Sequence, residues 1–431
     1  MQREQDIVHK LILRFNIVNV LGLIVFRILL DICYIIVINP FYQSVRMVNH
    51  ATISTYLISW FVFILFIPLI LENYSRKTLS ANVVVIFACF SFIPTTSLMA
   101  FIPVGIEFNI MMILYWLIIF GGNIIIKPFK LVDVNSYKTS NLFYLFLVIL
   151  TTTVLYVSGR YTGFRFHFGL FDIYDLRFEE RGFSLPSIIS YLHSAANVLL
   201  PVMLVYFLSQ LRYFMVGILS VVILLNFGIG GHKSVLFMLF LSFLGYWFYR
   251  FQRISYFSWT LVLICVFALS EYYLFDTFFV SAIMVLRVLF IPAELHLCYY
   301  DFFSKNELLY FKQGFFKWLN LPTPYSDNID FIIGGVYGGD YQIRANSGLF
   351  SDAYQNLGML GVVIFPFVVL FILRLLDAST KGLDEKLLII PILTTSMALM
   401  STTFSTALLT NGLFFMMIIL FFLPRNQKNA I

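Results

Sequence analysis

The sequence has little charge for its length. Of its 431 residues, only 12 % are Asp, Glu, Lys or Arg, whereas 60 % are hydrophobic and the mean hydropathy is +0.90. An ordinary soluble domain carries about twice that share of charge. A water-soluble core could not bury so much apolar surface. A soluble globular protein is therefore excluded, and the bilayer must act as the solvent.

Cysteine is also scarce, with four residues in the whole chain. Cys33, Cys89 and Cys265 lie inside apolar runs without metal-ligand spacing, which is typical of small buried hydrophobic side chains, and Cys298 has no evident partner. No GxxxxGK[ST] phosphate-binding loop occurs, so we expect no ATP hydrolysis by this chain. The formal charge of +6 is distributed by loop, as described below, and does not indicate nucleic-acid binding.

The apolar runs lack the alternating pattern of transmembrane β-strands and are near 20 residues long. In lipid, every backbone polar group must pair within its own segment or around a closed barrel. The runs therefore predict an all-α, polytopic integral membrane protein of about 12 transmembrane helices. The expected spans are 15–38, 51–71, 81–100, 108–126, 141–158, 188–209, 214–230, 234–249, 256–275, 356–376, 387–408 and 412–423.

Lys and Arg gather in alternate connections, among them Arg76, Lys77 and Arg250, while the short connections on the opposite side hold only Arg46 and Lys233. The positive-inside rule then places both termini in the cytoplasm. The predicted organisation is transmembrane helices 1–9 in residues 1–275 with a smaller periplasmic loop at 159–187, a large periplasmic loop with membrane-surface helices at 276–355, and helices 10–12 with a cytoplasmic C-terminus in 356–431.

The large loop opens with the densest group of reactive side chains. Arg287 stands in an otherwise apolar stretch, which is costly at membrane depth unless the guanidinium faces a cavity or a partner. Glu294, His296 and Asp301 follow within a few helical turns, and each is a credible general base. An interfacial anchor, in which Arg287 reaches toward the headgroups, is the competing interpretation.

A second group lies where the loop returns to the membrane. Paired glycines permit close backbone approach, and Tyr337 and Tyr341 beside Asp340 offer ring faces and hydroxyl partners suited to carbohydrate. Arg344 could bind an anion there. A glycine-rich connection without a ligand is the alternative.

The outer connections earlier in the chain supply further cations. Lys233 follows a glycine-rich turn, and Arg160 and Arg165 belong to a basic loop that could bind anionic headgroups or a diphosphate. A tight turn with a solvated lysine, and local neutralisation of the arginines by nearby carboxylates, are the competing interpretations.

Read in order, these residues resemble the Wzy-type family of O-antigen and other oligosaccharide repeat-unit polymerases. The likeness rests on Arg287-x-x-x-x-Pro292 leading into Tyr299-Tyr300-Asp301-Phe302-Phe303, and on Arg344-Ala-Asn346-Ser347-Gly348 with Gly358-x-x-Gly361 beyond it. The turn Gly231-His232-Lys233-Ser234, the span count and the late large loop also fit.

The resemblance implies a glycosyltransferase of lipopolysaccharide or related polysaccharide biosynthesis in the bacterial inner membrane, with its active site facing the periplasm. Its substrates would be two undecaprenyl-diphosphate-linked oligosaccharides, the growing chain being transferred onto a new lipid-linked unit. The family implies no metal or other cofactor, and a separate chain-length regulator as partner.

The physics of that reaction assigns roles to the candidates. Positioned cations would stabilise the diphosphate leaving group, a base would activate the acceptor hydroxyl, and holding both substrates at one site would supply proximity. The expected diphosphate ligands are Arg287, Arg344, Lys233, Arg160 and Arg165; the bases, in order, are His296, Glu294 and Asp301; the sugar contacts are Tyr300, Tyr337, Asp340 and Tyr341.

Two other functions use similar substrates. A flippase or exporter for lipid-linked oligosaccharide would need polar residues along its spans, facing a central path. An O-antigen ligase would use the same donor but a lipid A core acceptor. A non-catalytic membrane scaffold is a third alternative, and the outer arginines argue against it.

Overall fold

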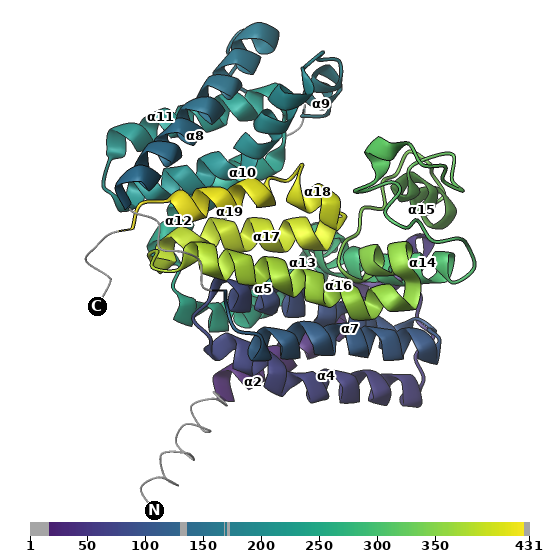
Figure 1. Cartoon of the computed structure of the whole chain (residues 1–431). Helices are drawn as coiled ribbons and strands as arrows, with labels where there is room; N and C mark the ends of the chain where they lie inside the picture. Colours follow the sequence, from purple (N-terminus) through teal and green to yellow (C-terminus); the bar gives the residue numbers. More distant parts are fainter. Residues whose placement is uncertain (1–16, 130–135, 168, 170–172, 426–431) are drawn as a thin grey trace, which may run out of the picture. The chain divides into compact units, whose positions relative to one another are not determined.

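The computed structural model describes residues 17–129, 136–167, 169 and 173–425, so the predicted location of both termini concerns residues outside the described ones. All regular structure among these residues is helical (Figure 1). The α-helices are α2 (Ile17–Cys33), α3 (Asn39–Phe41), α4 (Ile53–Ser75), α5 (Leu79–Phe87), α6 (Ile93–Phe101), α7 (Ile106–Ile125), α8 (Ser136–Val157), α9 (Ile173–Arg181), α10 (Ser187–Ser209), α11 (Tyr213–Gly230), α12 (Lys233–Phe248), α13 (Phe257–Phe275), α14 (Ile291–Phe303), α15 (Ile329–Gly338), α16 (Phe350–Thr380), α17 (Ile389–Ser401), α18 (Phe404–Leu408) and α19 (Leu413–Phe422).

Shorter or wider helical turns connect or extend these helices. The π-helical segments are η1 (Tyr34–Ile38), η3 (Ala88–Phe92), η4 (Ser158–Thr162) and η6 (Ser281–Phe290), and the 3₁₀ turns are η2 (Gln43–Val45), η5 (Phe251–Tyr256), η7 (Lys317–Leu319) and η8 (Glu385–Leu388).

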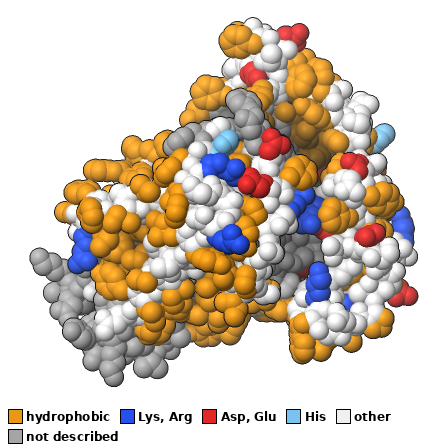
Figure 2. Space-filling model, turned by 90° about the horizontal axis from the view of Figure 1, so that it is seen from above, with side chains coloured by type: hydrophobic (Ala, Val, Ile, Leu, Met, Phe, Trp, Pro, Cys, Tyr) orange, Lys and Arg blue, Asp and Glu red, His pale blue; other side chains and the backbone are white. Residues whose placement is uncertain are grey.

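Eleven helices of the described part of the chain are long and apolar enough to cross a membrane. Many side chains on their surfaces are apolar and exposed, and apolar side chains cover much of the face shown in Figure 2. Exposing so much apolar surface to water is unfavourable, whereas the hydrocarbon core of a bilayer solvates it. The prediction of a polytopic, all-α membrane protein is therefore confirmed.

The set of spans differs from the predicted twelve. Lys233–Phe248 is only a short apolar helix, and Phe404–Phe422 counts as one candidate although a turn separates α18 from α19. Conversely, Ser281–Phe303, which we placed in the large loop, is a continuous helix of span length. The apolarity of a sequence run therefore did not by itself distinguish a helix of span length from a shorter helix packed among others.

The contacts of Ser281–Phe303 show how this helix runs in relation to its neighbours. Just before it, the ring of Phe278 stacks on that of Phe41, with centroids 4.8 Å apart, and near its end the Tyr300 hydroxyl donates to Glu107 at 3.3 Å. Phe41 and Glu107 flank two connections that meet where His50 N donates to Phe101 O. Phe278, just before this helix, and Tyr300, near its end, therefore both contact residues beside these two connections.

The chain divides into two compact units, each of which combines distant segments. Unit 1 comprises residues 1–127, 251–372 and 399–404, and unit 2 comprises 128–250, 373–398 and 405–431. In unit 1 the helix Leu79–Phe101 is almost wholly buried and packs against α2, α4, α7 and α14. In unit 2, α10 is the central element and contacts α8, α11, α12 and α19.

Three of the π-helical segments have a common origin in proline. η1, η3 and η6 each lead directly into an α-helix whose second residue is Pro40, Pro94 or Pro292. Proline lacks a backbone N–H and its ring clashes with the carbonyl four residues earlier. A wider turn before the ring relieves that clash without ending the helix, which explains why three apolar helices continue through proline.

A glycine causes the sharpest break inside a helix. Gly358 in α16 has φ 56° and ψ −133°, a conformation that side-chain-bearing residues rarely adopt, so the helix runs in two directions on either side of it. The first part, from Phe350, packs against the loop end of unit 1, where the rings of Phe350 and Phe108 lie 5.5 Å apart.

A buried ion pair lies within the first candidate span of unit 1. Arg27 and Asp31 are paired one helical turn apart, as their spacing predicts, and both are almost completely buried. Ser97 donates to Asp31 at 2.5 Å, and Arg27 donates to Ser59 at 3.0 Å. Charges at this depth are stable only when paired, and here their partners come from three helices.

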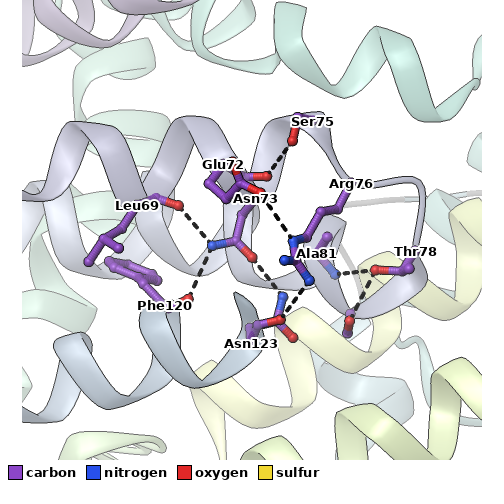
Figure 3. A network of polar contacts seen from close by, with 10 residues as sticks. Leu69, Glu72, Asn73, Ser75, Arg76, Thr78, Ala81, Phe120 and Asn123 are labelled. Atoms are coloured by element: carbon purple, nitrogen blue, oxygen red, sulfur yellow. Dashed lines mark hydrogen bonds and ion pairs between the residues drawn. The ribbon is translucent and has the colours of Figure 1, made fainter. Parts of the chain in front are cut away.

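At the opposite end of unit 1, a polar network joins α4 to α7 (Figure 3). The Asn73 amide donates to Leu69 O at 2.8 Å and to Phe120 O at 3.3 Å, and Asn123 donates to Asn73 Oδ1 at 2.7 Å. Arg76 adds a bond to Asn123 O and lies 3.7 Å from Glu72. Since both asparagines are fully buried, each lost partner would leave an unsatisfied amide.

We expect Asn73→Ala to lower the thermal midpoint of the detergent-solubilised protein, at a cost of about 1–3 kcal/mol, because it removes buried hydrogen bonds to Leu69 O, Phe120 O and the Asn123 amide. The measurement is thermal unfolding of the purified protein. Asn328→Ala is the matched control, since that exposed amide has no side-chain hydrogen bond to a described residue. Equal midpoints for the two variants would show that the network does not stabilise the bundle.

Candidate functional site

Four polar residues share one face of α14 and of the turn that follows it. Glu294, Cys298, Asp301 and Lys305 are spaced by four, three and four residues, which places them on a single stripe. The Cys298 thiol donates to Glu294 Oε1 at 2.8 Å, and Lys305 Nζ donates to Asp301 Oδ1 at 2.6 Å. Glu294 is buried, whereas the Asp301 side chain is 42 % exposed.

Arg46 provides the positive charge opposite this stripe. Its Nε lies 3.6 Å from Glu294 Oε1, Nη1 donates to the Cys298 sulfur at 3.4 Å, and the guanidinium stands over the Tyr337 ring, 4.7 Å from its centre. The residue has φ 65°, a left-handed conformation unusual for arginine. Its backbone turn, with Arg46 N bonded to Gln43 O and Val48 N to Arg46 O, directs the side chain to this position.

Tyr337, near the end of α15, completes the cluster. Its hydroxyl donates to Asp301 Oδ2 at 2.7 Å, so Asp301 accepts from a tyrosine and from a lysine. Burial, then the hydrogen bond and charge of Asp301, raise the pKa of Tyr337 well above its ordinary value. Tyr337 therefore stays a donor at neutral pH. We call Arg46, Glu294, Cys298, Asp301, Lys305 and Tyr337 the Arg46 cluster.

The paired glycines before Tyr337 have a packing role. A Cβ on Gly334 would lie 1.9 Å from Ile343 O, and one on Gly335 would lie 2.2 Å from the Tyr341 ring. The segment after α15 thus folds back onto this helix. Tyr341 covers Gly335, and Asp340 accepts from Gln342 N at 2.8 Å within its own turn. Tyr341 and Asp340, the two predicted sugar contacts, are thus engaged in local structure. Tyr341 is nevertheless 61 % exposed.

His296, the first-ranked base, points away from the Arg46 cluster. Its side chain is only 1 % exposed, and both ring nitrogens are engaged, Nε2 with Ser91 Oγ at 3.0 Å and Nδ1 with Ser351 Oγ at 2.7 Å. A histidine that acts as general base needs one ring nitrogen free and within hydrogen-bond reach of the substrate. The position favours a role in joining α14 to η3 and α16, and it moves Asp301 ahead of His296 and Glu294 as the accessible base.

The remaining candidates of unit 1 are separate from this cluster. Tyr300 donates to Glu107 and packs against Phe108 and Tyr354. Arg344 is 58 % exposed, lies 3.7 Å from Asp330 and stands over the Phe331 ring. Arg287 is exposed on η6 and makes no hydrogen bond or ion pair with a described residue.

Lys233, Arg160 and Arg165 belong to unit 2, whereas the Arg46 cluster belongs to unit 1. Lys233 and Arg160 are exposed. Arg165 donates to Glu179 at 2.8 Å and to Gly228 O at 3.2 Å. The carboxylate neutralisation considered from the sequence therefore applies to Arg165.

A second titratable cluster lies in unit 2, around Glu180 of α9. His232 Nε2 donates to Glu180 Oε2 at 3.1 Å, and His193 Nδ1 lies 3.9 Å from Oε1. Gly230 lacks a side chain where a Cβ would lie 2.3 Å from the carboxylate, which explains the glycine-rich turn after α11. Burial opposes the charge of Glu180, yet the His232 hydrogen bond and the charges of His232, His193 and Arg177 hold its pKa below the ordinary value.

Sequence reasoning missed Arg46, Cys298 and Lys305 as members of a site. A signal for Arg46 was present, because it was one of two basic residues on the short connections predicted to lie on the outer side. Among the described residues, no group of three or more His, Cys, Asp or Glu side chains could hold a metal ion.

No family model, curated protein or solved structure matches the chain.

The depressed pKa of Glu180 predicts a pH dependence of stability. A carboxylate whose pKa is lower in the folded state stabilises it above the unfolded value, about 4.3, and this contribution is lost as the pH falls through the folded value. We expect Glu180→Gln to lower the thermal midpoint at pH 7 and to reduce the further loss between about pH 5 and pH 3.

Thermal unfolding across that range is the measurement. Glu307→Gln is the control, because that exposed carboxylate has no hydrogen-bond partner among the described residues. If Glu180→Gln kept the wild-type acid slope, the interpretation of Glu180 as a stabilising carboxylate would be wrong.

Proposed function

We propose that this protein is a bacterial inner-membrane glycosyltransferase that polymerises undecaprenyl-diphosphate-linked oligosaccharide units, and that the Arg46 cluster belongs to its active site. The observation that carries the proposal is a partly exposed group of two cations, two carboxylates and a tyrosine at one end of an otherwise apolar helical unit. Headgroup-level chemistry on a lipid-linked substrate requires charge at that location.

Asp301 suits the role of general base in this reaction. Its carboxylate is part-exposed and is oriented by Tyr337 and Lys305, so an acceptor hydroxyl could approach one of its oxygens. A base held within hydrogen-bond reach typically contributes 10²–10⁴-fold to the rate. Tyr337 keeps the proton it donates, because its pKa is raised, and so positions Asp301 without competing for the acceptor proton.

Arg46 suits the stabilisation of developing negative charge on the diphosphate. Its side chain is 37 % exposed, and the guanidinium has donors beyond those directed at Glu294 and Cys298. Arg binds phosphate oxygens bidentately and stays charged at any relevant pH. Arg287 and Arg344 are exposed and remain proposed ligands in unit 1, whereas Lys233, Arg160 and Arg165 of unit 2 stay predictions from the sequence.

The alternative of a flippase finds less support. The charged pair inside the first candidate span, Arg27 and Asp31, is buried and bonded to serines of the protein, and neither residue is exposed. A transport path would instead present such groups to a cavity. A ligase would use the same donor chemistry, and the choice of acceptor distinguishes it from a polymerase.

The direct experiment is reconstitution of the purified protein with a lipid-linked repeat unit in proteoliposomes. A ladder of longer lipid-linked glycans is expected. Movement of the substrate across the bilayer without elongation would favour the flippase, and transfer only to an added lipid A core acceptor would favour the ligase.

Arg46→Ala should reduce elongation in this assay at least 100-fold, the effect typical of removing one positioned charge-stabilising donor. Arg46→Lys should recover only part of the rate, because a lysine cannot bind two oxygens at once. Lys77→Ala removes an exposed cation outside the cluster and should leave the rate unchanged. Wild-type elongation by correctly folded Arg46→Ala would remove Arg46 from the proposed site.

Asp301→Asn should reduce elongation by 10²–10⁴-fold while leaving the thermal midpoint close to that of wild type, because Asp301 lies at the surface. His296→Ala should show the opposite pattern, a lower midpoint with a smaller effect on rate, because both of its ring nitrogens bind buried serines. Glu294→Gln tests the base ranked second from the sequence. If His296→Ala abolished elongation without loss of stability, the original ranking of bases would be restored.

A further inference from the structure

The segment between α14 and α15 carries a feature that the proposed reaction does not use. Every residue from 315 to 322 is exposed, yet five of these eight side chains are large and apolar: Phe315, Phe316, Trp318, Leu319 and Leu321. Trp318 is 77 % exposed. We call residues 315–322 the aromatic tip. A contiguous apolar patch outside the spans indicates a surface that is covered in the working protein.

The aromatic tip is held in place by hydrogen bonds on its inner side. Lys312 Nζ donates to Pro322 O at 2.9 Å and so closes the loop. Gln313 donates to Asp327 O at 2.9 Å and accepts from Ile329 N at 2.8 Å, which ties the loop to the start of α15. The tip therefore presents its apolar side chains from a fixed base.

The entry to the loop is fixed as well. Leu309 N donates to Gln355 O at 2.9 Å, and Phe311 N donates to Asn356 Oδ1 at 2.8 Å. Tyr310 and Phe311 both have left-handed backbone conformations, with φ 50° and 61°, which bulky residues adopt only where the surroundings impose it. The direction in which the tip points is thus specified by the fold.

We infer that the aromatic tip inserts among the lipid headgroups of the bilayer, with a preference for anionic lipid. Two observations favour lipid over a protein partner. Lys317 stands among the exposed rings, and aromatic side chains beside lysine are the composition of a membrane interface. The Phe315 ring also lies 6.0 Å from Phe404, the residue of unit 1 at which the candidate span Phe404–Phe422 begins.

This inference does not depend on the proposed reaction. A tip anchored in the headgroups would hold the loop from 304 to 328 close to the membrane surface. The Arg46 cluster is linked to the start of that loop through Lys305. Any lipid-linked substrate of this protein would then approach across a surface that the tip itself helps to form.

The test uses Trp318→Cys labelled with an environment-sensitive nitrobenzoxadiazole dye. All four native cysteines are buried, so the new thiol can be labelled selectively, with wild type measured as the background. The control is Ser326→Cys, an exposed polar position of the same loop. Both proteins are placed in nanodiscs at one copy per disc, which removes a second copy as a source of protection.

In nanodiscs whose lipid carries a nitroxide on the headgroup, we expect quenching at position 318 to exceed that at position 326 at least twofold, with emission shifted to shorter wavelength. Replacing part of the phosphatidylcholine by phosphatidylglycerol should increase the quenching at 318. Lys317→Glu in the same labelled protein should abolish that increase, because it reverses the charge that attracts anionic lipid.

Equal quenching at the two positions would overturn the inference. So would protection of position 318 that appears only with several copies per disc, since the tip would then be an interface between copies of this chain. Quenching that is unaffected by phosphatidylglycerol and by Lys317→Glu would overturn the lipid preference. Loss of elongation in the reconstituted assay changes none of these readouts, so the two proposals fail separately.

Discussion

The structure depends on one constraint, which is that a polar group inside an apolar bundle must find a partner within the protein. Three groups of buried polar side chains in the described part of unit 1 meet it. Asn73 and Asn123 bind each other and backbone carbonyls, Arg27 and Asp31 pair across one turn, and His296 lies between two serines. The asparagine and histidine contacts connect helices far apart in the sequence.

The polar groups of the Arg46 cluster also have partners within the protein, but the cluster is not fully buried. Its two carboxylates each have a cation, Glu294 with Arg46 and Asp301 with Lys305, so the four charges balance. Arg46 and Asp301 nevertheless keep part of their surface exposed. A balanced and partly open cluster can accept an anion or activate a hydroxyl by exchanging protein partners for substrate atoms, without first creating an unpaired charge.

The sequence predicted the class of fold because apolar run length is a local property. It also predicted the Arg27–Asp31 pair, whose four-residue spacing makes it local as well. It ranked His296 first because histidine titrates near neutrality, a property of the residue type that ignores burial. It missed Arg46 because Arg46 and Glu294 are 248 positions apart in the sequence. Their contact also depends on a left-handed backbone conformation at Arg46, which an arginine in the sequence does not predict.

The break at Gly358 has a consequence beyond the shape of α16. A helix that turns aside no longer uses all its carbonyls, and those of Gln355 and Asn356 accept bonds from Leu309 and Tyr310. The loop bearing the aromatic tip is thereby joined to the helix by backbone hydrogen bonds. The aromatic tip is therefore held by the part of α16 that precedes Gly358, so its position depends on the backbone freedom of that one glycine.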